Sequence, residues 1–141
     1  MLMPALSVYT DAGARGNPGP AAIAVLFFEG SKLVKQHGEY IGSATNNQAE
    51  YRAVIKAMEL AHSLGMKELE LFTDSELVAR QLSGKYKVKD AKLKLLHETA
   101  KALEKNFEKV SYSSLSRSNL RIWLADKLVN RILDSEARKK D

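Results

Sequence analysis

The chain contains no cysteine among its 141 residues, which excludes a disulfide framework and any metal site built from thiolates. Its first residues, MLMPALSVYT, lack the basic segment and the longer apolar stretch of a secretory signal. No run of residues approaches the roughly 18 consecutive apolar positions of a membrane-spanning helix. We therefore expect a soluble protein of the cytoplasm that does not associate with a membrane.

Positive charge is concentrated in the second part of the chain, although the net charge is only +5. Residues 1–84 contain seven Lys and Arg against nine Asp and Glu, whereas residues 85–141 contain fifteen against eight. A basic segment suits a polyanionic partner such as a nucleic acid, because neutralising phosphates releases counterions. A lysine-rich solvated surface explains the same composition, and charge alone does not separate the two.

The pattern of apolar residues predicts a single α/β domain over residues 1–141, with a mixed sheet covered by helices. Alternation predicts strands over 6–10, 21–28 and 33–40, which form an antiparallel meander. Helical spacing over 46–64 stops at Gly65, a favourable residue just past a helix end. Further elements are expected at 68–73 (strand), 75–84 and 89–106 (helices), 109–115 (strand) and 122–138 (helix), with 137–141 as a frayed tail.

Two of the predicted strands end in the same way, in VYTD at 8–11 and LFTD at 71–74. Residues just past strand ends are where α/β sheets tend to build their sites. Asp11 and Asp74 are therefore candidate site residues. Each also has a local explanation, because an aspartate suits a turn or the cap of a helix, and Asp74 precedes a predicted helix.

Glu50 is the sharper anomaly, because it shares a helical stripe with residues that should face the sheet. Val54, Ala57, Ala61 and Leu64 follow it at intervals of four and three residues. A lone inward carboxylate is costly and needs a counter-charge, of which a metal ion is the simplest. Asp126 repeats the pattern more weakly, on a stripe with three aliphatic residues: Ile122, Val129 and Leu133.

Several carboxylates in one site repel one another unless cations lie among them. Ligands that are all oxygen favour hard ions such as Mg²⁺ or Mn²⁺. Two such ions can activate a water molecule and stabilise the leaving oxygen in phosphodiester hydrolysis. The acidic residues would then hold metal, and the basic segment would hold a polyanion.

The glycine-rich segment at 13–20 does not predict a nucleotide-binding loop. Its glycines at 13, 16 and 19 match neither G-x-G-x-x-G nor a Walker loop, and a strand is expected to follow it. We expect these residues to turn the first strand back into the second and to let a substrate backbone approach closely.

Together these residues resemble ribonuclease H type 1, in the compact form found in archaea and some bacteria. The resemblance covers nearly the whole chain, and its motifs in this order and spacing are highly specific. They are TDAG at 10–13, RGNPGP at 15–20, TNNQAEYRA at 45–53, FTDS at 72–75 and ADKLVN at 125–130.

The resemblance implies a five-stranded mixed sheet of order 3-2-1-4-5, with strands 1–3 as an antiparallel meander flanked by helices. It implies an endonuclease that cuts the RNA strand of RNA/DNA hybrids with two Mg²⁺ ions, with Mn²⁺ as a possible substitute. The products would carry 5′-phosphate and 3′-hydroxyl ends. No obligate protein partner is evident, and a monomer is expected. A nucleic-acid-binding module on the same fold, or a related nuclease with another substrate, remains as an alternative.

The resemblance also assigns residues. The metal-binding catalytic carboxylates would be Asp11, Glu50, Asp74 and Asp126, and Glu50 would also help to position a 2′-hydroxyl of the RNA. Asn17, Asn46 and Asn47 would reach the minor groove of the hybrid, where recognition is largely independent of sequence. Local roles in a turn or a helix cap are the alternative for these asparagines. Thr45 suits a DNA phosphate at the helix start, and Gln48 and Ser75 are further substrate-binding candidates.

The chain departs from larger relatives in two places. The segment between Leu82 and Leu93 has no room for a basic protrusion, and Tyr86 stands where a tryptophan is common. Tyr86 suits stacking on the DNA strand or packing within its loop. The segment before Asp126 lacks the mobile histidine of many relatives, and Arg117 is the catalytic candidate in its place, with Arg121 second. The three histidines, at 37, 62 and 97, are expected at the surface.

Overall fold

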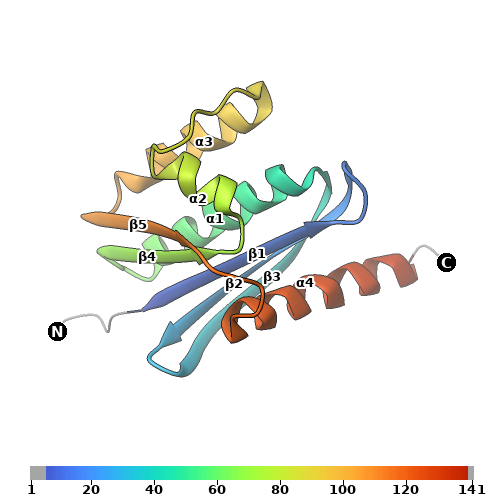
Figure 1. The fold of residues 1–141 in the computed structure, drawn as a ribbon. Coiled ribbons are helices and arrows are strands. Elements are labelled where there is room, and N and C mark those ends of the chain that lie inside the picture. The colour runs from blue at the N-terminus through green and yellow to red at the C-terminus, as the bar shows by residue number, and fades with distance from the viewer. Residues whose placement is uncertain (1–5, 140–141) are drawn as a thin grey trace.

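The computed structural model describes residues 6–139, which form one five-stranded sheet and four helices (Figure 1). The strand order is β3-β2-β1-β4-β5, with β1, β2 and β3 antiparallel and β4 and β5 parallel to β1. The predicted fold class and strand order are confirmed. In chain order, the elements are β1 (Ser7–Ala14), β2 (Gly19–Glu29), β3 (Lys32–Ala44), α1 (Asn46–Ser63), β4 (Glu68–Thr73), α2 (Glu76–Leu82), α3 (Ala91–Glu104), β5 (Lys109–Ser114) and α4 (Leu120–Lys139).

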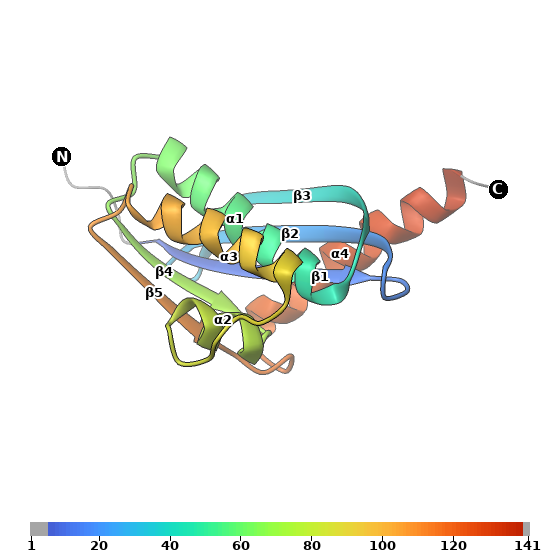
Figure 2. The same ribbon diagram turned by 90° about the horizontal axis from the view of Figure 1, so that it is seen from above.

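Helices cover both faces of the sheet, as Figure 2 shows from above. One face packs against α1 and α2, with α3 packed on α1, and the other face packs against α4. Residues 21–28 of β2 are all buried, because this strand has side chains in both layers. The strand β3 forms an edge of the sheet and is mostly exposed.

The helix α4 crosses the sheet at close range. An added Cβ on Gly38 of β3 would lie 2.6 Å from the Cδ1 atom of Ile132, so a larger residue there would require the side chains of α4 to shift. The helix buries Ile122, Ala125 and Val129 against β1 and β2. The predicted inward stripe of α4 is therefore confirmed, and Asp126 lies beside it.

The first three strands are longer than the alternation predicted, whereas β4 has its predicted bounds and β5 ends one residue earlier. β1 was expected to end at Thr10 but continues to Ala14, because its antiparallel pairing with β2 runs to Ala14↔Ala21. On its other side, β1 pairs with β4 only as far as Thr10↔Thr73. Asp11 therefore lies inside a strand and not past its end, at the first position where one edge of β1 has no partner strand.

The connection from β1 to β2 is a turn between antiparallel strands, as expected for the glycine-rich segment. Gly16 has a positive φ of 117°, a conformation that side chains rarely adopt. A Cβ on Gly19 would collide with the carbonyl oxygen of Arg15. These two glycines shape the turn.

Each of the first three helices begins at a side-chain cap. Thr45 and Gln48 form a reciprocal capping box at α1, and Ser75 and Asp90 accept hydrogen bonds from Val78 and Leu93 at the starts of α2 and α3. Asn46, Asn47 and Asp74 were considered as caps and do not have that role. The helix α4 continues through Lys139, so residues 137–139 of the expected frayed tail are helical, while residues 140–141 lie outside the described part.

None of the helices formed by residues 6–139 combines the length and the hydropathy needed to span a lipid bilayer.

Candidate active site

The shared TD motif of the first and fourth strands brings two aspartates together. The parallel register pairs Val8 with Leu71 and Thr10 with Thr73, so Asp11 and Asp74 follow at the same level of the sheet. Asp11 is 2 % exposed, and the side chain of Asp74 is 7 % exposed. Two acidic side chains are thus held next to each other away from solvent.

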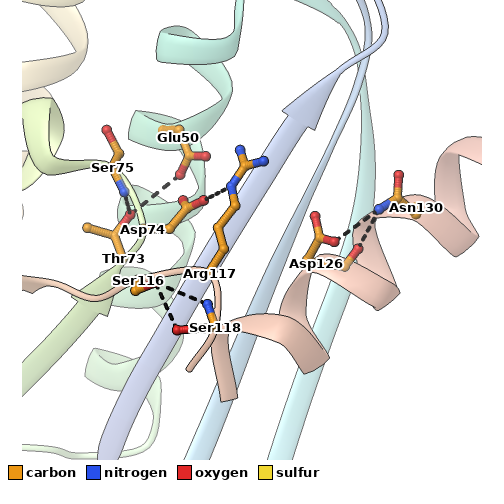
Figure 3. Close-up of polar contacts among 9 residues, drawn as sticks. All are labelled: Glu50, Thr73, Asp74, Ser75, Ser116, Arg117, Ser118, Asp126 and Asn130. Carbon is orange, nitrogen blue, oxygen red and sulfur yellow. Dashed lines mark hydrogen bonds and ion pairs between the residues drawn. The ribbon is translucent and has the colours of Figure 1, made fainter. Parts of the chain in front are cut away.

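The helix α1 adds the third carboxylate. Glu50 is buried in the first turn and a half of α1, on the side that faces the sheet, as its stripe predicted. The hydroxyl of Thr73 donates a hydrogen bond of 3.5 Å to its Oε2 atom (Figure 3). One oxygen from each of Asp11, Glu50 and Asp74 lies within 4.8 Å of the other two. We call these three residues the carboxylate triad.

The environment of the triad favours protonation when no cation is present. Burial raises the pKa of Asp11 to about 9, with the charge of Asp74 as the second cause and that of Asp126 as a smaller one. Burial, followed by the charges of Asp11 and Asp74, raises the pKa of Glu50 well above its ordinary value. Such carboxyls ionise when a positive ion lies among them.

The donor set fits a hard divalent cation. All three side chains offer carboxylate oxygens, the ligands that Mg²⁺ and Mn²⁺ prefer. In addition, the Oδ1 atom of Asp74 is buried and has no hydrogen-bond partner among residues 6–139. A buried carboxylate oxygen without a partner is costly, and a metal ion would satisfy it.

Asp126 lies at the side of the triad and not within it. It comes from α4, is partly exposed, and accepts a hydrogen bond of 3.3 Å at Oδ2 from the amide of Asn130 (Figure 3). The same amide donates to the backbone carbonyl of Asp126. The two faces of the sheet thus contribute to one site, with Glu50 from α1 and Asp126 from α4.

Of the two arginines considered near Asp126, Arg117 reaches the site and Arg121 does not. The Nε atom of Arg117 donates a hydrogen bond of 2.9 Å to Oδ2 of Asp74. Arg121 lies by the other end of β1, where its guanidinium stacks over Phe28 and donates to the hydroxyl of Tyr9. The histidines lie elsewhere, with His62 exposed and His37 and His97 partly buried.

A cleft of about 470 Å³ opens above these groups. Its lining includes side chains from both helices that flank the site and from the loop before α4. The candidate residues among them are Asn46, Asn47, Glu50, Asp74, Ser75, Arg117 and Asp126.

Several of the predicted substrate contacts already have partners within the protein. Oδ1 of Asn17 accepts a hydrogen bond from the backbone N–H of Asn46, and Oδ1 of Asn46 accepts one from Ala14. Thr45 and Gln48 are engaged in the capping box. Tyr86 is 46 % exposed, outside the cleft lining, with the guanidinium of Arg80 5.3 Å from its ring.

Two polar residues of the cleft were not identified from the sequence as site residues. Asn130 follows Asp126 by four positions, a helical spacing that places both on one side of α4. Arg15 forms an ion pair of 2.6 Å with Asp134, and these residues lie far apart in the chain. The helical spacing from Asp126 could have identified Asn130, whereas no local sequence pattern indicates Arg15.

The sequence and the fold both match known proteins. Residues 9–132 match the family model described as "Reverse transcriptase-like". Ribonuclease HI of Halobacterium salinarum is 41% identical over 128 residues, which are 89% of this chain and 63% of that protein. The bifunctional protein Rv2228c of Mycobacterium tuberculosis is 38% identical over 133 residues, 93% of this chain and 36% of that protein. The chain thus spans about a third of the first curated relatives it matches and under two thirds of the archaeal one.

Solved structures give the same result over whole domains. RNase H1 from Halobacterium salinarum superimposes with a TM-score of 0.87 at 39% identity, covering 92% of this chain and 98% of that one. LC11-RNase H1, solved in complex with an RNA/DNA hybrid, gives a TM-score of 0.86 at 38% identity, with 94% and 99% covered. LC11-RNase H1 was isolated from compost by a metagenomic approach.

Proposed function

Because the chain belongs to the ribonuclease H type 1 family, we propose that it hydrolyses the RNA strand of RNA/DNA hybrids as a metal-dependent endonuclease. The observation that carries the proposal is the carboxylate triad, in which two buried acids and the partly buried Asp74 lie within 4.8 Å of one another under an open cleft. LC11-RNase H1, which shares 38% of its residues and the fold, was solved with such a hybrid bound.

The cofactor we propose is Mg²⁺, with Mn²⁺ as a substitute, at two ions per active site. Asp11, Glu50 and Asp74 would hold them, with Asp126 as the fourth ligand; the orphaned oxygen of Asp74 supports this. When bound, such ions supply an activated water molecule and stabilise the leaving oxygen, which gives 5′-phosphate and 3′-hydroxyl ends.

The chain's own groups then have distinct tasks. Glu50, at the α1 side of the cleft, would also accept from the 2′-hydroxyl next to the cut. Arg117 would act at the reacting phosphate or on release of the product, because its long and exposed side chain already reaches the triad at Asp74. Asn130 would hold the carboxylate of Asp126 toward the cleft.

The hybrid would be recognised mainly along α1. The hydrogen bonds that Asn17 and Asn46 make use their Oδ1 atoms, which leaves each NH₂ group to donate to base edges and 2′-hydroxyls in the minor groove. Asn47 lines the cleft and would join them. Thr45 and Gln48 would bind a phosphate of the DNA strand together with the N-terminus of α1. Ser75 and Tyr86 are proposed as further contacts.

We also propose that residues 1–141 act as a single domain, as a monomer in the cytoplasm without an obligate protein partner. Residues 6–139 build hydrophobic layers on both sides of one sheet, which supports independent folding.

A cleavage assay tests the proposed function. Purified protein is incubated with an end-labelled RNA/DNA hybrid in Mg²⁺ or Mn²⁺, beside Asp11→Asn and Asp74→Asn variants. We expect the RNA strand to be cut by the wild type, and the variants to lose at least about a hundredfold in rate. Duplex DNA and double-stranded RNA of the same sequence serve as controls. No cleavage of the hybrid with either metal would contradict the proposal, and full activity of the variants would contradict the assignment of the triad.

A further inference from the structure

A second concave surface lies along α4, next to the cleft. It has a volume of about 420 Å³ and is lined by side chains from α4 itself. All of these side chains are exposed. We call it the α4 groove, and its residues are Lys127, Asn130, Arg131, Asp134 and Arg138.

The α4 groove is continuous with the active-site cleft. Asn130 lines both, and it bonds to Asp126 at the edge of the triad. From there α4 runs on toward the C-terminus, where its last turns project beyond the sheet (Figure 2). A strand that leaves the cleft on this side would therefore follow the helix.

The groove carries an excess of positive charge. Lys127, Arg131 and Arg138 form no ion pair within residues 6–139. The only acidic residue of the lining, Asp134, pairs with Arg15 at 2.6 Å, so that its charge is balanced from the turn between β1 and β2. The local field thus favours an anion with several charges.

Lys127 lies beside an aromatic neighbour. Its Nζ atom lies 4.4 Å from the ring centroid of Trp123, four residues before it on α4. Trp123 is the only tryptophan of the chain and is 44% exposed. A large aromatic side chain left in solvent beside a cation is typical of nucleic-acid-binding surfaces.

The spacing of the charges suits one strand of a nucleic acid. Lys127 and Arg138 are eleven positions apart, which corresponds to about 16 Å along a helix. One strand of a duplex places a phosphate about every 3.4 Å along its axis. The groove can therefore follow roughly five nucleotides.

We propose that the α4 groove binds the phosphodiester backbone of the RNA strand where it leaves the cleft. This rests on the proposed function. The strand that is cut must have its reacting phosphate at the triad, between α1 and α4. With the asparagines of the α1 side directed to the rest of the hybrid, this proposal places the cut strand nearest α4. The groove adds a basic surface on α4 to the one formed by three exposed lysines, Lys85, Lys87 and Lys89, between α2 and α3.

The test uses the double variant Arg131→Gln/Arg138→Gln. Its matched control is Lys35→Gln/Lys67→Gln. Lys35 is on the edge strand β3 and Lys67 directly precedes β4, so the control removes two exposed charges at the end of the sheet away from the cleft. Binding of a fluorescent hybrid is measured by anisotropy in Ca²⁺, and cleavage in Mg²⁺. We expect the Kd and the KM of the groove variant to rise about three- to tenfold, with a salt slope shallower by about one to two. Its kcat should change little, and the control should resemble the wild type.

The strand is identified with hybrids that have single-stranded ends. Where the RNA extends past a shortened DNA strand, the weaker binding of the groove variant should persist. Where the DNA extends past a shortened RNA, the difference from wild type should disappear. An equal effect on both substrates, or a groove variant that binds like the control, would overturn the proposal. Melting temperatures of all variants check that each is folded.

The same experiment separates this inference from the proposed function. If the wild type binds the hybrid through the groove but cuts it with neither metal, only the nuclease activity fails. If it cuts the hybrid and the groove variant has unchanged Kd and KM, only the groove fails.

Discussion

The Nε atom of Arg117 lies 2.9 Å from the Oδ2 atom of Asp74, joining the loop before α4 to the residue that follows β4. The two side chains differ sharply in environment, since that of Arg117 is 81% exposed and that of Asp74 is 7% exposed. The hydrogen bond to Asp74 raises the pKa of Arg117, which therefore stays charged. The exposed guanidinium of Arg117 thus contacts one oxygen of Asp74, while the other oxygen, Oδ1, has no hydrogen-bond partner within residues 6–139.

Replacing Arg117 with alanine is expected to lower kcat for hybrid cleavage about tenfold while changing KM by less than about twofold. The reason is that Arg117 contacts the triad and not the part of the cleft that would hold the rest of the duplex. Arg117→Lys keeps the charge and should recover part of the rate. Steady-state kinetics on one hybrid measure both values, and a kcat equal to wild type would remove Arg117 from the mechanism.

Replacing Asp11 with asparagine is expected to stabilise the metal-free protein. In the wild type, folding places this carboxyl beside Asp74 away from water, so at neutral pH it must take up a proton that the unfolded chain does not bind, which costs free energy. We expect a gain on the order of 1–3 kcal/mol, or about 3–10 °C in Tm in EDTA. Added Mg²⁺ should raise the Tm of the wild type and not that of the variant. Asp134→Asn, at an exposed position, is the control and should lower Tm slightly. An Asp11→Asn protein less stable than wild type in EDTA would contradict this explanation.

The stability of the metal-free protein should fall as pH rises. The pKa of Asp11 is raised from 3.8 to about 9 on folding, so the folded state binds more protons than the unfolded state between these values. Its contribution is therefore fully present below about pH 4 and is lost by about pH 9, and Glu50 acts in the same direction. Urea titrations across this range in EDTA measure the slope, which Asp11→Asn should flatten. If stability falls with pH no more steeply in the wild type than in Asp11→Asn, the raised pKa of Asp11 is refuted.

Asp126 and Asn130 should differ in the size of their effects. Asp126→Asn removes a proposed ligand and is expected to lower kcat/KM about a hundredfold. Asn130→Ala only frees the carboxylate of Asp126 and should lower it about three- to tenfold. Asn106→Ala, an exposed position far from the cleft, is the matched control. Equal losses for Asn130→Ala and Asp126→Asn, at unchanged Tm, would show that the amide itself acts in the reaction.

The central part of the site was predictable because it follows local patterns. The repeated TD motif fixed the register that places Asp11 beside Asp74, and the stripe of α1 fixed the inward direction of Glu50. The elements flanking these motifs were also predictable from apolar spacing. Their exact ends were not, because β1 extends past Thr10 only through its pairing with β2.

Contacts between distant residues carried no local signal. The choice between Arg117 and Arg121 depended on how the loop at 115–119 enters α4, since both lie before Asp126 in the sequence. Asn17 and Asn46 were expected either to contact substrate or to have local roles, and the structure shows that their Oδ1 atoms hold the turn to the start of α1. The ion pair of Arg15 with Asp134 joins opposite ends of the chain and follows from the tertiary fold alone.

β1 continues past the last residue of β4 with which it pairs, and Asp11 lies at that point. This arrangement limits which insertions and deletions the protein can accept during evolution. Because Asp11 and Asp74 meet through strand register, loops can grow or shrink around the site without moving them. A single residue inserted within β4, however, would turn Asp74 to the opposite face of the sheet. We therefore expect relatives of this chain to differ in length between their strands and helices, and to tolerate neither insertions nor deletions within β1 and β4.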